Sequence, residues 1–258
     1  MLELNKVYNE DCLKVIELMD DNSLDLVLTS PPYNVNLGQN KYNKNKYALY
    51  NDNKEHKDYI DWLKLIFKNL FQKLKVGGRV VINIGDGKNG ACPTHSDIIQ
   101  FMTKELSYIP MTEIIWNKSQ VGSRTAWGSF NSPSSPSFPT PFEYVLVFAK
   151  ETTKLQYKGE SDLTKEEFIP WSLAIWNIAP ETKMNKVYGH PAMFPKELAK
   201  RCIKMFTYKG ATIFDPFNGA GTTCVVAKNL GRNFIGSDIS LEYCNTTNKR
   251  LVEEIDVP

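Results

Sequence analysis

Apolar and polar positions along the chain form blocks of two kinds. Short, nearly continuous apolar runs predict buried strands. These are expected at Leu24–Leu28, Arg79–Ile84, Thr112–Trp116, Glu143–Phe148, a short run ending at Asp215, and Asn233–Asp238. Apolar residues at helical spacing predict helices at His56–Lys75, which Gly77-Gly78 ends, at Lys196–Met205 and at Cys224–Leu230. The alternation of strands and helices favours an α/β fold with a mostly parallel central sheet and helices on both faces.

A stiff turn, Thr29-Ser30-Pro31-Pro32-Tyr33, follows the first predicted strand. Consecutive prolines restrict the backbone and remove two N–H donors, but their carbonyls remain acceptors. Ligands of open α/β sheets bind at the carboxyl ends of strands. Ser30 Oγ and the Pro31 carbonyl are therefore placed to accept from one planar NH2 group, and Tyr33 to stack on the flat ring that carries it. The exocyclic amino group of a nucleobase fits this combination. Taken alone, the turn is also consistent with an ordinary tight loop.

A glycine turn follows the strand that ends at Asp215. Gly219 and Gly221 allow positive φ and a close approach of the backbone to a ligand. The third glycine of a dinucleotide fingerprint is missing, which argues against a pyrophosphate cradle. Asp238 ends the next strand about 20 residues later, the spacing at which a carboxylate meets ribose hydroxyls. A nucleoside without phosphates fits both features.

Together, the two turns resemble those of the S-adenosylmethionine-dependent DNA amino-methyltransferases. The catalytic Thr29–Tyr33 turn comes first and the Phe217-x-Gly219-x-Gly221 turn last, which resembles the beta group of that family. Trp127–Phe130 and Glu143–Phe148 are similar to the family's Trp-Gly-Ser to Glu-Tyr-x-Leu-x-Phe stretch. The resemblance covers nearly the whole chain. It implies a Rossmann-like methyltransferase fold, with residues 1–258 forming a single catalytic domain.

The resemblance also implies roles for individual residues. Asp11-Cys12 looks like the family's Asp-Cys segment, whose carboxylate receives the adenine amino group of the cofactor. His190–Pro195 looks like the element that lines the methionine end, Asp215 is expected to fix the methionine amino group, and Asp238 the ribose. The predicted cofactor-binding residues are Asp11, Cys12, Asp215, Phe217, Asn218, Gly219, Gly221, Thr222, Asp238, His190 and Phe194. The predicted catalytic residues are Ser30, Pro31, Pro32 and Tyr33.

The implied reaction is methyl transfer from S-adenosylmethionine to the amino group of a base flipped out of duplex DNA, which leaves S-adenosylhomocysteine. The sulfonium is already a good leaving group, so direct transfer needs neither a catalytic cysteine nor a metal. In the family, serine before Pro-Pro-Tyr is commoner in enzymes that act on N4 of cytosine, and Asp or Asn in those that act on N6 of adenine, with exceptions. Ser30 therefore favours cytosine, and adenine stays the alternative.

Other classes of function stay open at this point. A related tetrapeptide occurs in methyltransferases of RNA or of protein glutamine amides, but the Trp-Gly-Ser to Glu-Tyr stretch argues against them. A DNA-binding module without catalysis would not need the intact glycine turn followed by Asp238.

Composition is that of an intracellular enzyme. The 258 residues are 42% hydrophobic, enough for one α/β core. The five cysteines are odd in number and lack Cys-x-x-Cys spacing, which argues against a disulfide framework and a zinc site. The three histidines show no paired ligand spacing. The N-terminus has no apolar run of signal or membrane length, so we expect a cytoplasmic protein without a membrane partner.

A formal net charge of +2 is modest for a protein that binds DNA, so basic residues must be concentrated locally. Residues 35–57 show neither helical nor strand periodicity and are predicted to form a mobile loop. Residues 119–142 and 151–189 are predicted to be small DNA-recognition insertions. The residues expected to contact DNA are Lys41, Lys44, Lys46, Arg124 and Trp127. Such short insertions suggest a short target sequence. A homodimer is one way to recognise such a target. A cognate restriction endonuclease stays open as a further partner.

Overall fold

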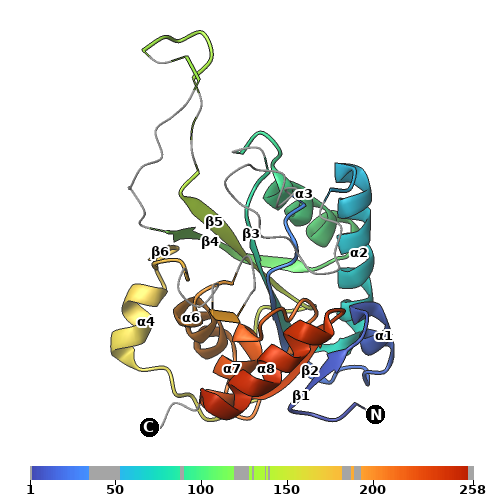
Figure 1. The fold of residues 1–258 in the computed structure, drawn as a ribbon. Coiled ribbons are helices and arrows are strands. Elements are labelled where there is room, and N and C mark those ends of the chain that lie inside the picture. Colours follow the sequence, from blue (N-terminus) through green and yellow to red (C-terminus); the bar gives the residue numbers. More distant parts are fainter. Residues whose placement is uncertain are drawn as a thin grey trace.

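The computed structural model describes residues 2–34, 53–87, 90–118, 128–129, 131–136, 138, 140–181, 187–188 and 193–254. In this part of the chain, eight strands form one sheet in the order β1-β8-β7-β2-β3-β5-β4-β6 (Figure 1). The strands are β1 (Lys6–Asn9), β2 (Leu24–Thr29), β3 (Leu74–Ile84), β4 (Ile109–Asn117), β5 (Phe142–Ala149), β6 (Ile175–Asn177), β7 (Thr212–Asp215) and β8 (Asn233–Asp238).

The sheet is mostly parallel. Strands β1, β8, β7, β2 and β3 are paired in parallel, β5 runs antiparallel to both β3 and β4, and β6 pairs in parallel with β4. The helices between the strands are α1 (Cys12–Glu17), α2 (His56–Lys73), α3 (Thr94–Gln100), α4 (Lys165–Trp171), α6 (Lys196–Phe206), α7 (Thr222–Asn229) and α8 (Leu241–Glu253), and a π-helical turn η2 (Phe101–Glu105) continues α3.

Two apolar layers cover the two faces of the sheet. In β2, Leu26 and Leu28 pack into the layer that holds α6, α7 and α8, whereas Val27 packs into the layer that holds α1, α2 and α3. Figure 1 shows these helix groups on opposite sides of the sheet. Side chains of a strand point alternately to the two faces, so a central strand buried on both sides reads as a continuous apolar run. The predicted fold class, a mostly parallel α/β sheet with helices on both faces, is confirmed.

The boundary between α2 and β3 differs from the sequence prediction. Helix α2 ends at Lys73, and Leu74 already pairs with Leu24 of β2, five positions before the predicted start of the strand at Arg79. The register with β2 then shifts before Arg79 pairs with Leu26. Gly77, with φ of +77°, lies in this irregular stretch, where a Cβ would come 2.3 Å from the Lys154 carbonyl oxygen. The glycines therefore shape a bulged strand rather than end a helix.

Part of the predicted recognition insertion 151–189 belongs to the core instead. Trp171 at the end of α4 and Trp176 in β6 are buried, and the guanidinium of Arg201 lies over both rings. Strand β6 extends the sheet beside β4. These two tryptophans belong to the core and are not available to contact DNA, while the recognition role of the rest of 151–189 stays a prediction.

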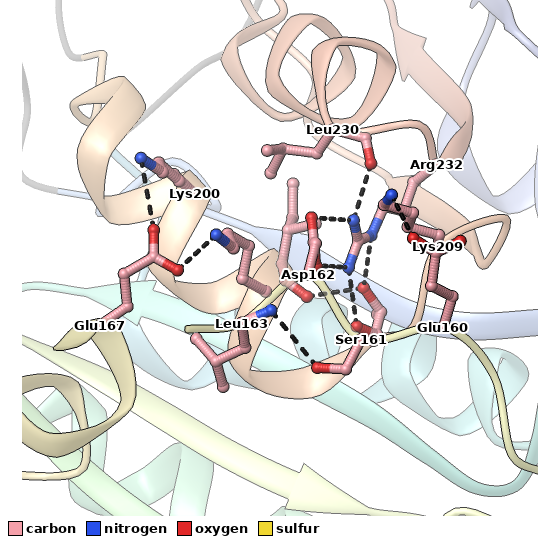
Figure 2. Close-up of polar contacts among 12 residues, drawn as sticks. Glu160, Ser161, Asp162, Leu163, Glu167, Lys200, Lys209, Leu230 and Arg232 are labelled. Carbon is pink, nitrogen blue, oxygen red and sulfur yellow. Dashed lines mark hydrogen bonds and ion pairs between the residues drawn. The ribbon is translucent and has the colours of Figure 1, made fainter. Parts of the chain in front are cut away.

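The segment before α4 is tied to the C-terminal half of the chain. Asp162 forms a bidentate ion pair with Arg232, whose side chain is completely buried (Figure 2). Thr164 caps α4 through the Glu167 backbone N–H, and the Glu167 carboxylate also pairs with Lys204 of α6. No helix in the described ranges has the length and apolar character needed to cross a membrane.

Candidate cofactor and base site

A cavity of about 240 Å³ opens at the carboxyl ends of β1, β2, β7 and β8. This is the edge at which parallel sheets bind ligands, because the loops that leave neighbouring strands converge there. The lining residues are Glu10, Asp11, Cys12, Ser30, Pro32, Tyr33, Lys54, Trp62, Met193, Phe194, Pro216, Phe217, Asn218, Gly219, Ala220, Thr222, Asp238, Ile239, Ser240 and Tyr243. Both turns singled out in the sequence therefore face one space, although they are far apart along the chain.

The glycine turn and Asp238 form the first wall of this cavity. Gly221 has φ of +81°, and a Cβ there would lie 2.2 Å from Thr247 Cγ2, so only glycine fits. The Gly219 backbone N–H donates to Asp238 Oδ2 at 2.8 Å, and the Ser240 N–H donates to Asp238 Oδ1 at 2.8 Å. Each carboxylate oxygen can accept more than one hydrogen bond, so acceptor capacity remains toward the cavity. Burial raises the pKa of Asp238, while the two backbone hydrogen bonds lower it.

Asn218 lines the cavity, but its hydrogen bonds are made to residues behind the cavity wall. Its Nδ2 donates to Thr247 Oγ1 at 2.8 Å, its Oδ1 accepts from Cys224 Sγ at 3.0 Å, and its backbone N–H donates to the Ser237 carbonyl at 3.0 Å. These bonds join the turn to α7, α8 and β8. Asn218 therefore fixes the shape of the glycine turn.

Asp215 does not line the cavity. It is 1% exposed, and its carboxylate accepts from Thr29 Oγ1 at 2.7 Å, from Thr223 Oγ1 at 2.6 Å and from the Phe217 N–H at 3.1 Å. Burial raises the pKa of Asp215 to about 6, against the lowering effect of the hydrogen bonds from Thr223 and Thr29. The expectation that Asp215 meets a methionine amino group is not supported by this arrangement, in which Asp215 connects the ends of β2 and β7 with α7.

Asp11 and Cys12 form the opposite wall. Asp11 is the N-cap of α1, with Oδ1 accepting from the Leu13 N–H at 2.8 Å. Burial and the neighbouring Asp11 charge raise the pKa of the Cys12 thiol to about 12, so the thiol is protonated at neutral pH and contributes apolar surface. Apolar side chains of Met193, Phe194 and Phe217 complete the cavity. Carboxylate acceptors on two walls, with apolar side chains between them, suit a nucleoside with polar groups on its base and its ribose.

Tyr33 belongs to a hydrogen-bonded group that the sequence did not reveal. Its hydroxyl donates to Glu143 Oε2 at 2.8 Å and accepts from Asn83 Nδ2 at 2.7 Å and from Ser30 Oγ at 3.1 Å. Lys118 forms an ion pair with the other oxygen of Glu143. We call Ser30, Tyr33, Asn83, Glu143 and Lys118 the Tyr33 cluster. Glu143 belongs to a recognised motif but had no predicted role, and Asn83 was expected only as part of an apolar strand.

Trp62 and Lys54 also line the cavity. Trp62, on the apolar face of α2, packs partly against the core, and its ring also lies 5.3 Å from that of Phe217, with Lys54 Nζ 4.6 Å above it. The Asn34 side chain is hydrogen-bonded to both the backbone N–H and the carbonyl of Lys54, each at 2.8 Å. Asn34 thus joins the residues on either side of the segment 35–52. A helical period alone cannot distinguish an aromatic residue facing a core from one facing a ligand cavity.

Several predicted site residues lie outside the described ranges. They are Lys41, Lys44, Lys46, Arg124, Trp127 and His190. Pro31 and Gly221 are described but support the cavity rather than line it. Among the described residues, no group of three or more His, Cys, Asp or Glu side chains is arranged to hold a metal ion.

Comparison with known proteins agrees with this geometry. The N6/N4 methyltransferase family model, described as DNA methylase, matches residues 24–249. The chain belongs to this DNA methylase family. It is therefore an S-adenosylmethionine-dependent DNA methyltransferase that acts on an amino group, and the resemblance seen in the sequence is confirmed.

Individual relatives span most of this DNA methylase. Type II methyltransferase M.MjaVI of Methanocaldococcus jannaschii is 39% identical over 177 residues, which cover 68% of this chain and 86% of the relative. Type II methyltransferase M.BglII of Bacillus subtilis is 29% identical over 270 residues, covering 98% of this chain and 70% of the relative.

A solved structure with cofactor is also similar. The Thermus thermophilus protein TTHA0409, complexed with S-adenosyl-L-methionine, matches with a TM-score of 0.75 and 27% identity over 97% of this chain and 94% of that one. Asp11, Asp238 and the glycine turn of our cavity are compatible with the same cofactor, because they offer acceptors for adenine and ribose beside apolar side chains.

Proposed function

We propose that this DNA methyltransferase modifies the exocyclic N4 amino group of cytosine in duplex DNA, by flipping the base and transferring the methyl group directly. The observation that carries the proposal is that Ser30 and Tyr33 line the same cavity as Gly219, Asp11 and Asp238. The acceptor group for a base and the walls for a methyl donor are therefore in contact with one space. Serine at position 30 supports cytosine over adenine, as the family tendency implies.

The roles of the chain's own residues follow from their positions. Asp238 accepts from ribose hydroxyls, Asp11 from the adenine amino group, and Phe217 and Phe194 form the wall between them. When bound, S-adenosylmethionine supplies a methyl group on a sulfonium sulfur. Ser30 Oγ and the Pro31 carbonyl accept from the target NH2 group, which localises the nitrogen lone pair, and Tyr33 stacks on the base. Catalysis then consists mainly of positioning and polarisation.

Flipping the base needs contacts that hold the opened duplex. Unpairing and unstacking cost a few kcal/mol, which phosphate contacts from basic residues offset. We assign these contacts to Lys41, Lys44, Lys46 and Arg124, and we assign Trp127 to the residues that contact DNA without a charge. The type II names of the relatives support a restriction-modification role, in which an endonuclease of the same target sequence is the partner.

Methylation of plasmid DNA with radiolabelled S-adenosylmethionine tests this function. After digestion to nucleosides, we expect label in N4-methylcytosine, and sequencing of the modified sites gives the target. Label in N6-methyladenine would support a DNA methyltransferase but overturn the assignment of cytosine as the target base. Absence of label, together with absence of cofactor binding by calorimetry, would overturn the proposed catalytic function.

Ser30→Ala is the sharpest single substitution for the proposed role of Ser30. Loss of the acceptor on the target amino group is expected to slow methyl transfer by about 100-fold, since positioned proton-handling groups contribute on this order. Cofactor affinity, measured by calorimetry, should stay unchanged because Ser30 faces the base. Ser172→Ala, the same substitution at an exposed hydroxyl outside the cavity, is the control. Transfer by Ser30→Ala at the wild-type rate would contradict this role.

A further inference from the structure

The hydroxyl of Ser30 begins a chain of hydrogen bonds in which each hydroxyl donates toward Glu143. An ionised carboxylate only accepts, so the Tyr33 O–H must point at Glu143 Oε2, 2.8 Å away. The Tyr33 oxygen then accepts from the Ser30 O–H at 3.1 Å. With its proton turned toward Tyr33, Ser30 Oγ accepts a long hydrogen bond from Asn83 Nδ2 at 3.5 Å, and a second lone pair stays available for a donor in the cavity. The chain therefore runs from the cavity to a carboxylate that is only 8% exposed.

Neighbouring groups hold this chain in place. Asn83 Nδ2 donates to both the Tyr33 hydroxyl, at 2.7 Å, and Glu143 Oε2, at 2.8 Å. Gly85 brings the backbone so close that a Cβ there would lie 3.2 Å from Tyr33 Cε2 and 3.3 Å from Glu143 Cγ. The ring of Tyr33 and the stem of Glu143 therefore pack against the same point of the backbone, and a larger residue at position 85 would press on both.

We propose that Glu143 is the terminal acceptor of the proton that the target amino group loses, and that it acts through Tyr33 and Ser30. This inference rests on the proposed function. As the nitrogen–methyl bond forms and the sulfur–methyl bond breaks, the nitrogen becomes cationic and must release one proton. That proton moves to Ser30 Oγ, the Ser30 proton moves to the Tyr33 oxygen, and the Tyr33 proton moves to Glu143 Oε2. The products are a neutral methylamino base, two restored hydroxyls and a neutral Glu143.

The same chain polarises the amino group before the proton moves. Hydrogen bonds in sequence strengthen one another, so a carboxylate at the far end makes Ser30 a better acceptor. Glu143 is therefore a positioning residue whose effect falls on the transfer step and not on cofactor binding. Among the described residues, the titratable groups in contact with the Glu143 carboxylate are Tyr33, beyond β2, and Lys118, beyond β4; Asn83 of β3 is uncharged.

Glu143→Gln tests the proposal because glutamine keeps the shape and can accept from Tyr33 but cannot take up a proton. We would measure single-turnover methyl transfer to DNA at saturating cofactor and DNA across a range of pH. A carboxyl that already carries a proton cannot accept another, so the wild-type rate should fall as the pH is lowered. The rate of Glu143→Gln should be lower by about 100-fold and should lack this acid limb, with cofactor affinity unchanged.

Two further variants separate the relay from simple support. Glu113→Gln, the same substitution at an exposed carboxylate of β4 outside the cavity, should keep the wild-type rate and the acid limb. Tyr33→Phe interrupts the chain before Glu143, so adding Glu143→Gln to it should slow transfer little further. A Glu143→Gln rate within about twofold of wild type, or an unchanged acid limb, would overturn the relay while the proposed function stands. No transfer by the wild-type protein would overturn both.

Discussion

The Tyr33 cluster and the cluster around Arg232 both bury a charged group, and they differ in whether their hydrogen bonds are complete. Arg232 Nε donates to Thr207 Oγ1, one terminal nitrogen donates to Asp162 and the Leu230 carbonyl, and the other to Asp162 and the Thr207 carbonyl. All five guanidinium N–H groups are thereby satisfied inside the protein, as Figure 2 shows. The Arg232 guanidinium therefore has no N–H group available for a ligand.

The Tyr33 cluster is left open at its ends. Ser30 faces the cavity, and in the described part of the chain Asn83 Oδ1 is buried without a hydrogen-bond partner. A buried acceptor without a partner destabilises the folded state. Of these two clusters, the complete one lies outside the cavity lining, and the open one has Ser30 and Tyr33 in that lining.

Arg232→Ala should give the largest loss of stability. The substitution leaves Asp162, Thr207 and two carbonyls without their donor, and breaking a buried pair in this way costs roughly 3–5 kcal/mol. Urea denaturation would measure this free energy of unfolding. Methyl transfer per folded molecule should not change, because none of these residues lines the cavity.

Lys209→Ala provides the control for that comparison. Lys209 pairs with Glu160 in the same region (Figure 2), but the two side chains are 44% and 70% exposed. Exposed pairs contribute about 0–1 kcal/mol. Equal losses of stability for Arg232→Ala and Lys209→Ala would show that burial of the Arg232 cluster does not stabilise the fold. A loss of methyl transfer per folded molecule in Arg232→Ala would show that this cluster serves the site.

Asp215→Asn tests a second buried cluster, in which burial disfavours the ionised form of the Asp215 carboxyl. Burial raises the pKa of Asp215 to about 6 in the folded state, above the ordinary 3.8. The folded state therefore holds the proton more tightly, and the stabilisation is fully present below pH 3.8 and lost as the pH rises through about 6. Relative to Asp215→Asn, which does not titrate, the wild type should lose about 2 kcal/mol of stability between about pH 4 and pH 7.

Urea denaturation of both proteins at several pH values measures this difference. Asp20→Asn, the same substitution at an exposed carboxyl, is the matched control. A constant difference between wild type and Asp215→Asn across this range would mean that the Asp215 carboxyl is not perturbed by its burial.

The contrast between the clusters also explains what the sequence could predict. Ser30 to Tyr33 and Phe217 to Gly221 are local turns, where residue order alone dictates backbone stiffness and positive φ. Strands β2, β3, β4, β5, β7 and β8 and helices α2, α6 and α7 followed from hydrophobic period, whereas β1, β6, α1, α3, α4 and α8 were not predicted. These features determine two parts of the cavity lining, because each of these turns directly follows a strand, whereas the wall at Asp11 and Cys12 was expected only from the family resemblance.

Contacts between distant segments could not be predicted in this way. Glu143 meets Tyr33 across 110 positions and Asn83 across 60, because β5 pairs antiparallel with β3 in a register that hydrophobic period does not specify. Asp162 meets Arg232 across 70 positions for a similar reason. A charged residue inside an apolar run, such as Glu143 at the start of β5, signals a partner but does not identify it.

Tyr33→Phe should give the smallest loss of stability. It therefore separates an effect on methyl transfer from an effect on folding most clearly. Glu143 Oε2 keeps its hydrogen bond from Asn83, so loss of the Tyr33 hydroxyl should cost only about 1 kcal/mol. Tyr108→Phe is the matched variant, because the buried Tyr108 hydroxyl donates to the Phe67 carbonyl at 2.9 Å outside the cavity. Both variants should unfold at similar urea concentrations, whereas only Tyr33→Phe should slow methyl transfer. If Tyr108→Phe slowed transfer equally, loss of a buried hydroxyl anywhere in the core would explain the effect, and the open Tyr33 cluster would have no special part in the reaction.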